Sequence, residues 1–287
     1  MAALKQQSDK AEQEAGVAPK GYEVGYRVFT INGRMLGHGE PIKVKRAERV
    51  LFHILNGSAT ENRSLALPGR TFKVVGLDGN PVPTPTSVPV LWLGPAERAS
   101  AIVEMNHPGV WELGDLADKD RKQGMGIVIE YAGSKGKPRW VTRAKSHWDY
   151  TRFGQARTTV APDEVIEMTL AKQRAAAQGF NLWTINGISF DMKAMKAMFR
   201  LRRGERYRLR TRNASDDTHP LHLHRHSFEL TKIAGKSTSG VIKDVVMLGA
   251  YQEMEVDFTA DQPGLTLFHC HMQIHMDYGF MALFDCA

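Results

Sequence analysis

The feature that most constrains the fold of this chain is an internal repeat. The tetrapeptide Thr30-Ile-Asn-Gly33 recurs 154 residues later as Thr184-Ile-Asn-Gly187. Four further matches keep the offset between 154 and 157: Asn56-Gly-Ser58 with Asn213-Ala-Ser215, Phe72 with Phe228, Pro108-Gly109 with Pro263-Gly264, and Gly124 with Gly279. A nearly constant offset indicates that one structural unit is present twice in tandem. A length of 287 residues suits two domains of ordinary size.

The repeated unit is predicted to be all-β. Short apolar or alternating runs are separated by Gly, Pro and Asn, as in Arg27-Val-Phe-Thr-Ile31 and Phe72-Lys-Val-Val75. Such runs at roughly regular spacing are typical of a β-sandwich. We therefore predict two tandem β-sandwich domains. The expected division is a flexible lead-in at 1–21, a first domain at 22–133, a linker at 134–160 and a second domain at 161–287.

Two short segments of the second copy concentrate the metal-binding residue types. They are His219-Pro-Leu-His-Leu-His-Arg-His226 and His269-Cys-His-Met-Gln-Ile-His275, which hold seven of the eleven histidines and one of the two cysteines. Successive side chains of a β-strand point to opposite faces. If both segments are strands lying side by side, one face carries the imidazoles of His222, His224, His269 and His271.

The opposite face would carry Cys270 and His219, and His275 could fold back toward them. Two histidines and one cysteine are typical of a trigonal blue-copper site, and a cluster of imidazoles also suits copper. Because His269 and His271 flank Cys270, the two clusters would be joined through bonds. Zinc is the alternative metal, but structural zinc sites often use pairs of cysteines spaced as CxxC, which this chain lacks.

The first copy serves as an internal control. None of its residues at the positions that match the seven candidate ligands is histidine or cysteine: Arg63, Ala66, Pro68, Gly114, Asp115, Leu116 and Asp120. The repeated unit therefore does not need these histidines in order to fold, which supports a metal-binding role for them in the second copy.

The two segments resemble the C-terminal copper motifs of multicopper oxidases, the laccase group. In that family the patterns HPxHxH and HCHxxxH supply the ligands of three kinds of copper site. The resemblance implies cupredoxin-like Greek-key domains that correspond to the family's second and third domains. It implies a type 1 copper held by His219, Cys270 and His275, a type 2 ligand at His222, and type 3 ligands at His224, His269 and His271. Phe280 stands at the family's axial position, and since it cannot ligate, a three-coordinate type 1 site is implied.

The chain departs from the family in one large respect. The family's trinuclear cluster uses eight histidines, four of them from two further HxH motifs in an N-terminal domain. Outside the two segments this chain has only isolated histidines: His38, His53, His107 and His147. We therefore expect a complete type 1 site and partial type 2 and type 3 sites. An N-terminal domain or a partner chain would have to supply the other four ligands.

The resemblance implies a laccase-like oxidase. Such an enzyme removes single electrons from phenols, aromatic amines or metal ions and reduces dioxygen to water, and His275, Cys270 and His219 would be its catalytic residues at the reductant side. The alternative is a non-enzymatic blue-copper protein that carries electrons or binds copper with only the type 1 site functional. A two-domain copper nitrite reductase is a third possibility that the sequence disfavours, because its type 1 site belongs in the first repeat.

Charge and hydropathy limit the partners. The formal net charge is +7, and the basic residues are scattered apart from the run 200–212, which we predict to be a strand with a solvated basic face and not a nucleic-acid site. No apolar run approaches ~18 residues, so no membrane span is expected. Residues 1–21 lack the apolar core of a signal peptide, whereas the family is usually exported. The sequence therefore leaves the localisation open.

Overall fold

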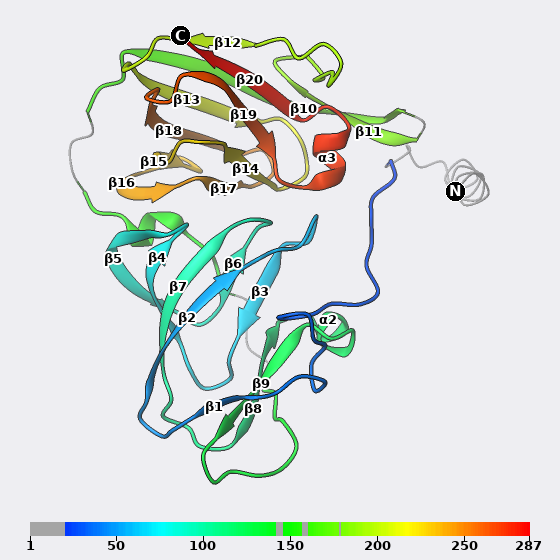
Figure 1. Ribbon diagram of the computed structural model, residues 1–287, viewed down its shortest axis with the longest axis vertical. Helices are drawn as coiled ribbons and strands as arrows, with labels where there is room; N and C mark the ends of the chain where they lie inside the picture. Colours follow the sequence, from blue (N-terminus) through cyan, green and yellow to red (C-terminus); the bar gives the residue numbers. More distant parts are fainter. Residues whose placement is uncertain (1–20, 142–145, 157–159, 178) are drawn as a thin grey trace.

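The computed structural model describes residues 21–141, 146–156, 160–177 and 179–287. Two β-sandwiches lie one above the other, the first copy below and the second above in Figure 1. The all-β prediction is confirmed by the strands that dominate both halves. The predicted lead-in lies outside the described residues except for Gly21, and parts of the predicted linker lie outside them too.

The first sandwich is built from nine strands in two sheets. One sheet has the strand order β1-β9-β8-β3-β6 and the other β2-β7-β4-β5. The bounds are β1 Ile42–Val44, β2 Arg49–Leu55, β3 Arg63–Ala66, β4 Phe72–Leu77, β5 Asn80–Val88, β6 Leu91–Leu93, β7 Arg98–Glu104, β8 Val110–Asp115 and β9 Gly126–Tyr131. The core lies between the two sheets and includes Phe72 and Val74, neither of which is exposed.

The second sandwich has the same plan with two additional strands. Its sheets have the orders β12-β20-β19-β14-β17 and β11-β10-β13-β18-β15-β16. The bounds are β10 Glu164–Ala177, β11 Phe180–Ile185, β12 Phe199–Leu201, β13 Arg206–Asn213, β14 His219–Leu223, β15 Phe228–Ile233, β16 Lys236–Lys243, β17 Val245–Leu248, β18 Glu253–Thr259, β19 Gly264–Cys270 and β20 Met281–Cys286. Strand for strand, β1-β9-β8-β3-β6 corresponds to β12-β20-β19-β14-β17, and β2-β7-β4-β5 corresponds to β13-β18-β15-β16. The predicted duplication is confirmed by this correspondence.

The repeated tetrapeptide forms the same tight turn in both copies. Asn32 and Asn186 adopt positive φ angles of 52° and 51°, and the glycines that follow them have φ angles of 74° and 77°. Positive φ at both central residues defines the type I′ turn that Asn-Gly favours. The turns close the isolated bridges Ile31↔Arg34 and Ile185↔Ile188. The Asn-Gly dipeptide is therefore retained in both copies because of the backbone conformation of this turn.

The helices of the described residues are all short. They are α2 Asp118–Lys122, the 3-10 helix η1 Tyr150–Phe153 and α3 Gln273–Asp277. The helices α2 and α3 occupy equivalent positions in the two copies: α2 follows β8, and α3 follows β19. No helix in the part of the chain that the structure describes is long and apolar enough to cross a membrane.

The basic run 200–212 contains a strand with alternating burial, as predicted, and its basic face also carries ion pairs. Alternate residues of β13 project from one face, and the guanidinium groups of Arg206, Arg208 and Arg210 are paired with carboxylates of the neighbouring strands. Arg208 contacts Asp257 through Nε at 2.7 Å, and Arg210 contacts Glu167 at 2.6 Å. The positive charge of this face is thus partly neutralised by cross-strand ion pairs. The sequence of β13 alone does not reveal these partners.

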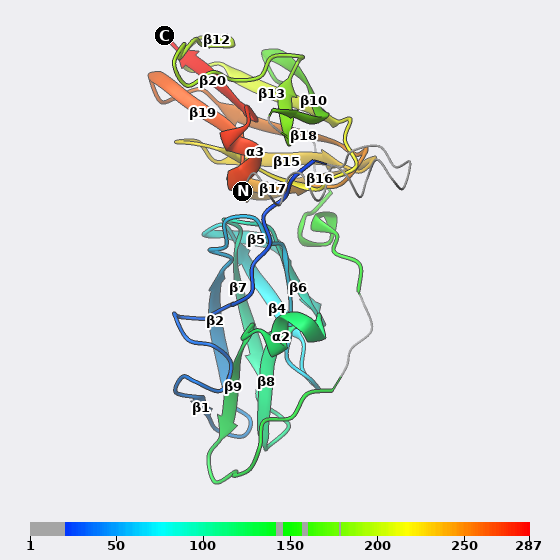
Figure 2. The ribbon, with the colours of Figure 1, turned by 90° about the vertical axis from the view of Figure 1, so that its right-hand side faces the viewer.

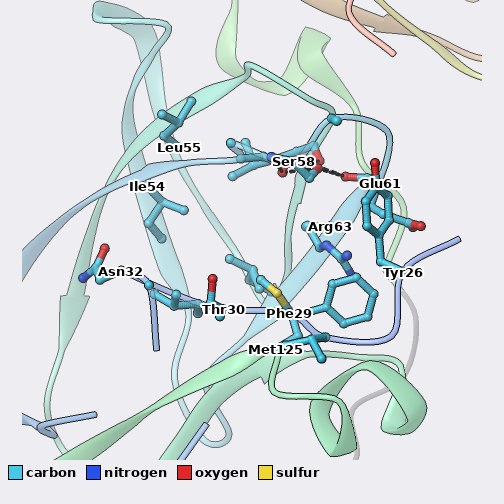
Figure 3. Close-up of a pocket in the computed structure, with 18 of the residues that line it drawn as sticks. Tyr26, Phe29, Thr30, Asn32, Ile54, Leu55, Ser58, Glu61, Arg63 and Met125 are labelled. Atoms are coloured by element: carbon cyan, nitrogen blue, oxygen red, sulfur yellow. Dashed lines mark hydrogen bonds between the residues drawn. The ribbon is translucent and has the colours of Figure 1, made fainter. Parts of the chain in front are cut away.

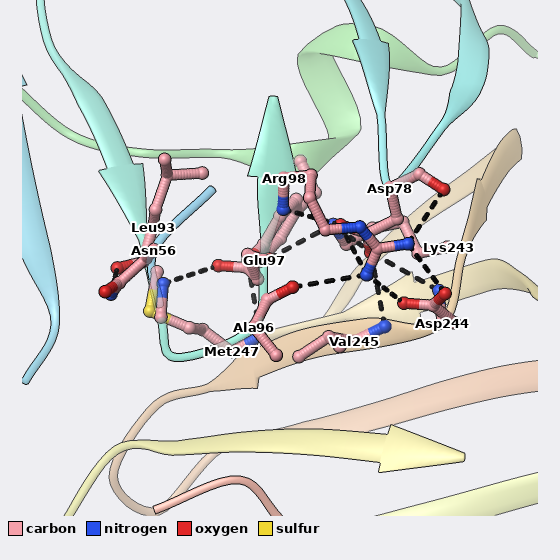
Figure 4. A network of polar contacts seen from close by, with 12 residues as sticks. Asn56, Asp78, Leu93, Ala96, Glu97, Arg98, Lys243, Asp244, Val245 and Met247 are labelled. Carbon is pink, nitrogen blue, oxygen red and sulfur yellow. Dashed lines mark hydrogen bonds and ion pairs between the residues drawn. The ribbon is translucent and has the colours of Figure 1, made fainter. Parts of the chain in front are cut away.

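Buried charges join the two sandwiches. The Lys243 ammonium, at the end of β16, lies 2.8 Å from Asp78 and 3.1 Å from Glu97 of the first sandwich. Tyr150 of η1 donates to Glu97 at 2.5 Å, so the segment between the domains takes part in the same cluster. Figure 4 shows Asp78, Glu97 and Lys243 meeting between β-strands of both copies, with Arg98 and Asp244 beside them. We call these six residues the interdomain charge cluster.

A second connection follows the start of the described chain. Residues 21–35 run from the upper sandwich down the side of the lower one, as the blue trace in Figures 1 and 2 shows. Tyr22 forms a parallel bridge with Phe180 of β11. Further along, the Phe29 N–H donates a hydrogen bond to the Gln123 carbonyl, which attaches the segment to the first sandwich. This segment consequently brings residues of the first copy beside the second.

Candidate metal centre

The candidate ligands come from two paired strands and one helical turn. In the second sandwich β14 and β19 are antiparallel neighbours, with Leu221 opposite Cys270 and His222 opposite His269. The strand pairing thus brings segments about forty-five residues apart into one layer. His275 lies in α3, the turn that follows β19. The chain therefore folds back after Cys270, as the spacing of the motif led us to expect.

One cluster consists of His219, Cys270 and His275. The Cys270 Sγ lies 3.7 Å from His219 Nδ1 and 3.6 Å from His275 Nδ1. All three residues are buried, and their potential donor atoms lie within 4.8 Å of one another. Burial raises the pKa of the Cys270 thiol and lowers the pKa of His219 well below its ordinary value. Desolvation by burial is the largest cause of both shifts, and the charges of His275 and Lys172 lower the pKa of His219 further.

Hydrogen bonds orient His219 so that Nδ1 faces the thiol. Its Nε2 lies 2.8 Å from Ser215 Oγ. The Ser215 hydroxyl donates to Asn213 Oδ1 at 2.8 Å, so its oxygen is left to accept from the Nε2–H of His219. The neutral imidazole then carries its lone pair on Nδ1, the form that a metal ligand requires.

Aromatic side chains close the cluster on one side. Trp183 of β11 is 1% exposed and lies over His275 with ring centroids 4.1 Å apart. Phe280 stacks on Trp183 at 5.1 Å and meets His219 edge-on at 4.8 Å. This apolar wall excludes water from one side of the cluster. It includes Phe280, which has no donor atom and which the family resemblance puts at the axial position.

A carboxylate lies at the outer side of His275, and the sequence motifs did not indicate it. Glu23 Oε2 is 3.8 Å from His275 Nε2, and Glu23 Oε1 accepts from Asn181 Nδ2 at 3.2 Å. Partial burial alone would raise the pKa of Glu23, but the hydrogen bond and charge of His275 more than offset this, and the pKa lies below its ordinary value. The side chain is 52% exposed, so it connects the buried imidazole with solvent. No signal in the sequence links residue 23 with residue 275, since only the path of 21–35 brings them together.

The second cluster consists of His222, His224 and His269, with His271 beside it. The Nε2 atoms of His224 and His269 are 2.9 Å apart, and donor atoms of the first three residues lie within 4.8 Å of one another. The His271 ring centroid is 5.3 Å from that of His269 and 5.8 Å from that of His222. The four imidazoles therefore face one another, as the alternation of the strands predicts.

Main-chain oxygens also fix the tautomers of this second cluster. His222 Nδ1 donates to the Asp244 carbonyl at 2.7 Å, and His269 Nδ1 donates to the Cys270 carbonyl at 2.8 Å. Both imidazoles thus turn an Nε2 lone pair toward the cluster. Burial is the main cause that lowers the pKa of His269 to about 3, so this imidazole stays neutral and able to bind a metal at ordinary pH. His226 lies apart, with Nδ1 donating to the carbonyl of His224 at 3.2 Å.

The first copy has an ion pair where the second copy has the Cys–His cluster. Arg63 Nη1 lies 2.6 Å from Asp120 and 4.0 Å from Asp115. These three residues stand at the positions of His219, His275 and Cys270. The same scaffold thus holds either a charge pair or a group of side chains that could hold a metal ion, so the fold itself does not require the Cys–His cluster.

Comparison with known proteins accounts for this arrangement. Models of the family described as "Multicopper oxidase" match residues 4–123 and residues 159–286 of the chain. The chain belongs to the multicopper oxidase family. Several curated relatives match most of this chain, but the chain spans only about half of their length.

Two of these relatives illustrate the extent of the similarity. The multicopper oxidase MmcO of Mycobacterium tuberculosis is 30% identical over 92% of this chain and 52% of its own length. The bilirubin oxidase of Albifimbria verrucaria is 25% identical over 93% of this chain and 51% of its own length. The crystal structure of a laccase from Botrytis aclada aligns with a TM-score of 0.78 at 16% identity, covering 97% of this chain and 61% of that chain. The last similarity supports the cupredoxin fold.

Proposed function

We propose that this chain is the copper-binding portion of a laccase-like multicopper oxidase. The observation that carries the proposal is the convergence of His219, Cys270 and His275, with both imidazole Nδ1 atoms directed at one sulfur at 3.6–3.7 Å. The donor set fits copper, because two histidines and one cysteine with no strong axial ligand favour an electron-transfer site.

Each residue has a separate task in this proposal. A copper ion held by His219, Cys270 and His275 would supply one-electron redox chemistry between a phenol, an aromatic amine or a metal ion and the site of dioxygen reduction. Trp183 and Phe280 keep water from the ligands on one side. The His275 side chain is itself buried, and the half-exposed Glu23 carboxylate beside it connects it with solvent, so a reductant can approach there and Glu23 can accept the proton that a phenol loses on oxidation.

The second cluster would serve as the oxygen-reducing end. Reduction of dioxygen to two waters consumes four electrons and four protons, so it needs an arrangement that collects single electrons. Cys270 is bonded through the backbone to His269 and His271, and these peptide units connect the two clusters directly. The four further histidines expected for a trinuclear site would come from another cupredoxin domain, on a longer form of the chain or on a partner.

The alternative function is a blue-copper carrier without oxidase activity. The exposure of His224 favours it, because this imidazole of the second cluster faces solvent and has no ligand set opposite among the described residues. An isolated His219–Cys270–His275 site would then exchange electrons with a protein or a small molecule and consume no dioxygen.

Oxygen uptake tests the proposal. The chain is reconstituted with copper, and dioxygen consumption is measured with an ortho-diphenol beside a Cys270→Ser control. Uptake by the unchanged protein alone supports an autonomous oxidase. A protein that turns blue but consumes no dioxygen excludes autonomous oxidase activity and leaves an electron carrier or a copper-binding portion that needs another domain.

A further inference from the structure

The first sandwich contains a cavity at the position that corresponds to the aromatic wall beside the Cys–His cluster of the second. The cavity has a volume of about 520 Å³ and lies between the segment 26–33, the end of β2 and the loop 57–61. Figure 3 shows Tyr26, Phe29, Arg63 and Met125 gathered around it. Cavities of this size hold small organic molecules in other proteins.

The repeat explains why this space is open. In the second copy Trp183 and Phe280 stack at 5.1 Å and are buried to 1% and 0% exposure. By the offsets of the repeat, their counterparts in the first copy are Phe29 and Met125, which are only half-buried and line the cavity. A smaller ring and an unbranched thioether replace two large stacked rings, so the volume that the aromatic wall fills in one copy is left free in the other.

Arg63, which lines this cavity, has a buried donor without an acceptor in the described part of the chain. The residue is 3% exposed, and its Nη1 is held at 2.6 Å from Asp120. Its Nη2 is buried and has no hydrogen-bond partner among the residues that the structure describes. A buried N–H without an acceptor costs free energy, so a group that provides an acceptor there gains more than the same group would in water.

The charges around Arg63 indicate what kind of acceptor fits. Two carboxylates, those of Asp120 and Asp115, already lie 2.6 and 4.0 Å from the guanidinium. Glu61 lines the cavity as a third acidic residue. An anionic ligand would meet an excess of negative charge, whereas a neutral carbonyl oxygen would accept the hydrogen bond without repulsion.

The walls indicate the rest of the ligand. Phe29 lies against the guanidinium of Arg63, whose central carbon is 4.1 Å from the ring centroid, and Tyr26 is tilted against Phe29 at 6.5 Å. Leu65, Leu93 and Met125 add apolar surface. We propose that this cavity is a binding site for a neutral aromatic carbonyl compound, with its oxygen on Arg63 Nη2 and its ring against Phe29 and Met125. The site is independent of copper and lies outside the machinery assigned to the oxidase function.

Binding of three probes of similar size tests the proposal. Acetophenone has the ring and the neutral carbonyl, benzoate adds a negative charge, and ethylbenzene lacks the acceptor. Each is titrated into the full chain while NMR follows the Arg63 side chain and the amides of 57–61. We expect saturable shifts with acetophenone at an affinity at least tenfold above those of benzoate and ethylbenzene. Absence of any shift at Arg63, or equal affinity for ethylbenzene, overturns the proposal.

Two variants assign the binding to this cavity. Thr30→Trp places a large side chain in the cavity from an exposed position, and we expect it to weaken acetophenone binding more than tenfold. The matched control is Thr259→Trp, at an exposed threonine of the second sandwich, which should bind as the unchanged chain does. Arg63→Lys keeps the positive charge beside Asp120 but removes Nη2, and about a tenfold loss is expected. If Thr30→Trp folds and binds acetophenone as tightly as the control, the proposal is wrong.

Discussion

The Lys243 ammonium lies 2.8 Å from Asp78 Oδ2 across the boundary between the two sandwiches, and neither side chain has any exposed surface. Glu97 contacts the same ammonium at 3.1 Å, and Arg98 forms a bidentate pair with Asp244 nearby at 2.6 and 2.7 Å. Because the Asp244 carbonyl also accepts from His222, the joint between the domains is adjacent to the second histidine cluster. The relative position of the sandwiches and the orientation of a candidate ligand therefore depend on neighbouring contacts.

Removal of the shared cation should loosen this joint. In Lys243→Met the carboxylates of Asp78 and Glu97 remain buried without their partner, and breaking a buried pair in this way costs about 3–5 kcal/mol. Chemical denaturation followed by tryptophan fluorescence measures the loss. Lys236→Met is the control on the same strand, since the exposed pair of Lys236 with Asp149 contributes about 0–1 kcal/mol. Equal stability of the two variants would contradict a structural role for the cluster.

The two acids of the cluster should give opposite pH dependences. Burial alone would raise the pKa of Asp78, but Lys243 and Arg98 more than offset it, so the pKa is lowered. The Asp78 carboxylate therefore contributes to the free energy of unfolding above its unfolded pKa of 3.8, and this contribution is lost as the pH falls through the folded pKa. Burial raises the pKa of Glu97 above its ordinary value of 4.5. Its contribution to the free energy of unfolding is therefore complete below pH 4.5 and is lost as the pH rises through the folded pKa.

Substitution of Glu97 isolates the second effect. Glu97→Gln keeps the shape of the side chain and does not ionise, so the decline in the free energy of unfolding on raising the pH from about 5 to 7 should be smaller than in the unchanged chain. Denaturation midpoints across this range measure the difference. Glu104→Gln, at an exposed position of β7, should follow the unchanged protein. A parallel pair of curves for Glu97→Gln and the unchanged chain would show that Glu97 does not titrate as expected.

The hydrogen bond from His219 to Ser215 should matter for copper affinity. Ser215→Ala removes the acceptor that fixes Nδ1 as the ligating atom, and loss of such a contact typically lowers metal affinity about 10–100-fold. Competition with a copper chelator, followed by the blue colour, measures the change. The repeat offers Ser58→Ala as a matched control, because Ser58 makes the same hydrogen bond to Asn56 without a histidine beside it. A similar loss in both variants would assign the effect to folding.

Glu23 should affect the approach of reductants and leave copper binding unchanged. Glu23→Gln keeps the contact with Asn181 but cannot accept a proton, so reduction of the blue colour by catechol without dioxygen should slow by roughly 10²-fold, a typical contribution of a general base. Stopped-flow measurement of the bleaching provides the rate. Glu40→Gln, an exposed acid elsewhere in the first domain, should leave the rate unchanged. An unaltered rate in Glu23→Gln would place the reductant at another surface.

Much of this protein is determined by its sequence alone. The offset between Thr30-Ile-Asn-Gly33 and Thr184-Ile-Asn-Gly187 revealed the duplication, because both turns need the same positive φ angles. Alternation along β14 and β19 sorted the histidines and Cys270 by face, because the side-chain period of a strand is fixed. Such local rules operate over a few residues and can be read without coordinates.

Only the tertiary structure decided which distant groups meet. Glu23 lies beside His275, Arg63 beside Asp120, and Lys243 beside Asp78, and each pair joins elements that are far apart along the chain. The basic residues of β13 share the solvent-facing side of the strand, as predicted, but Arg208 and Arg210 also pair with acids on β18 and β10. Periodicity reports the face on which a side chain lies, while its partner depends on how strands and domains pack, and that is a property of the whole fold.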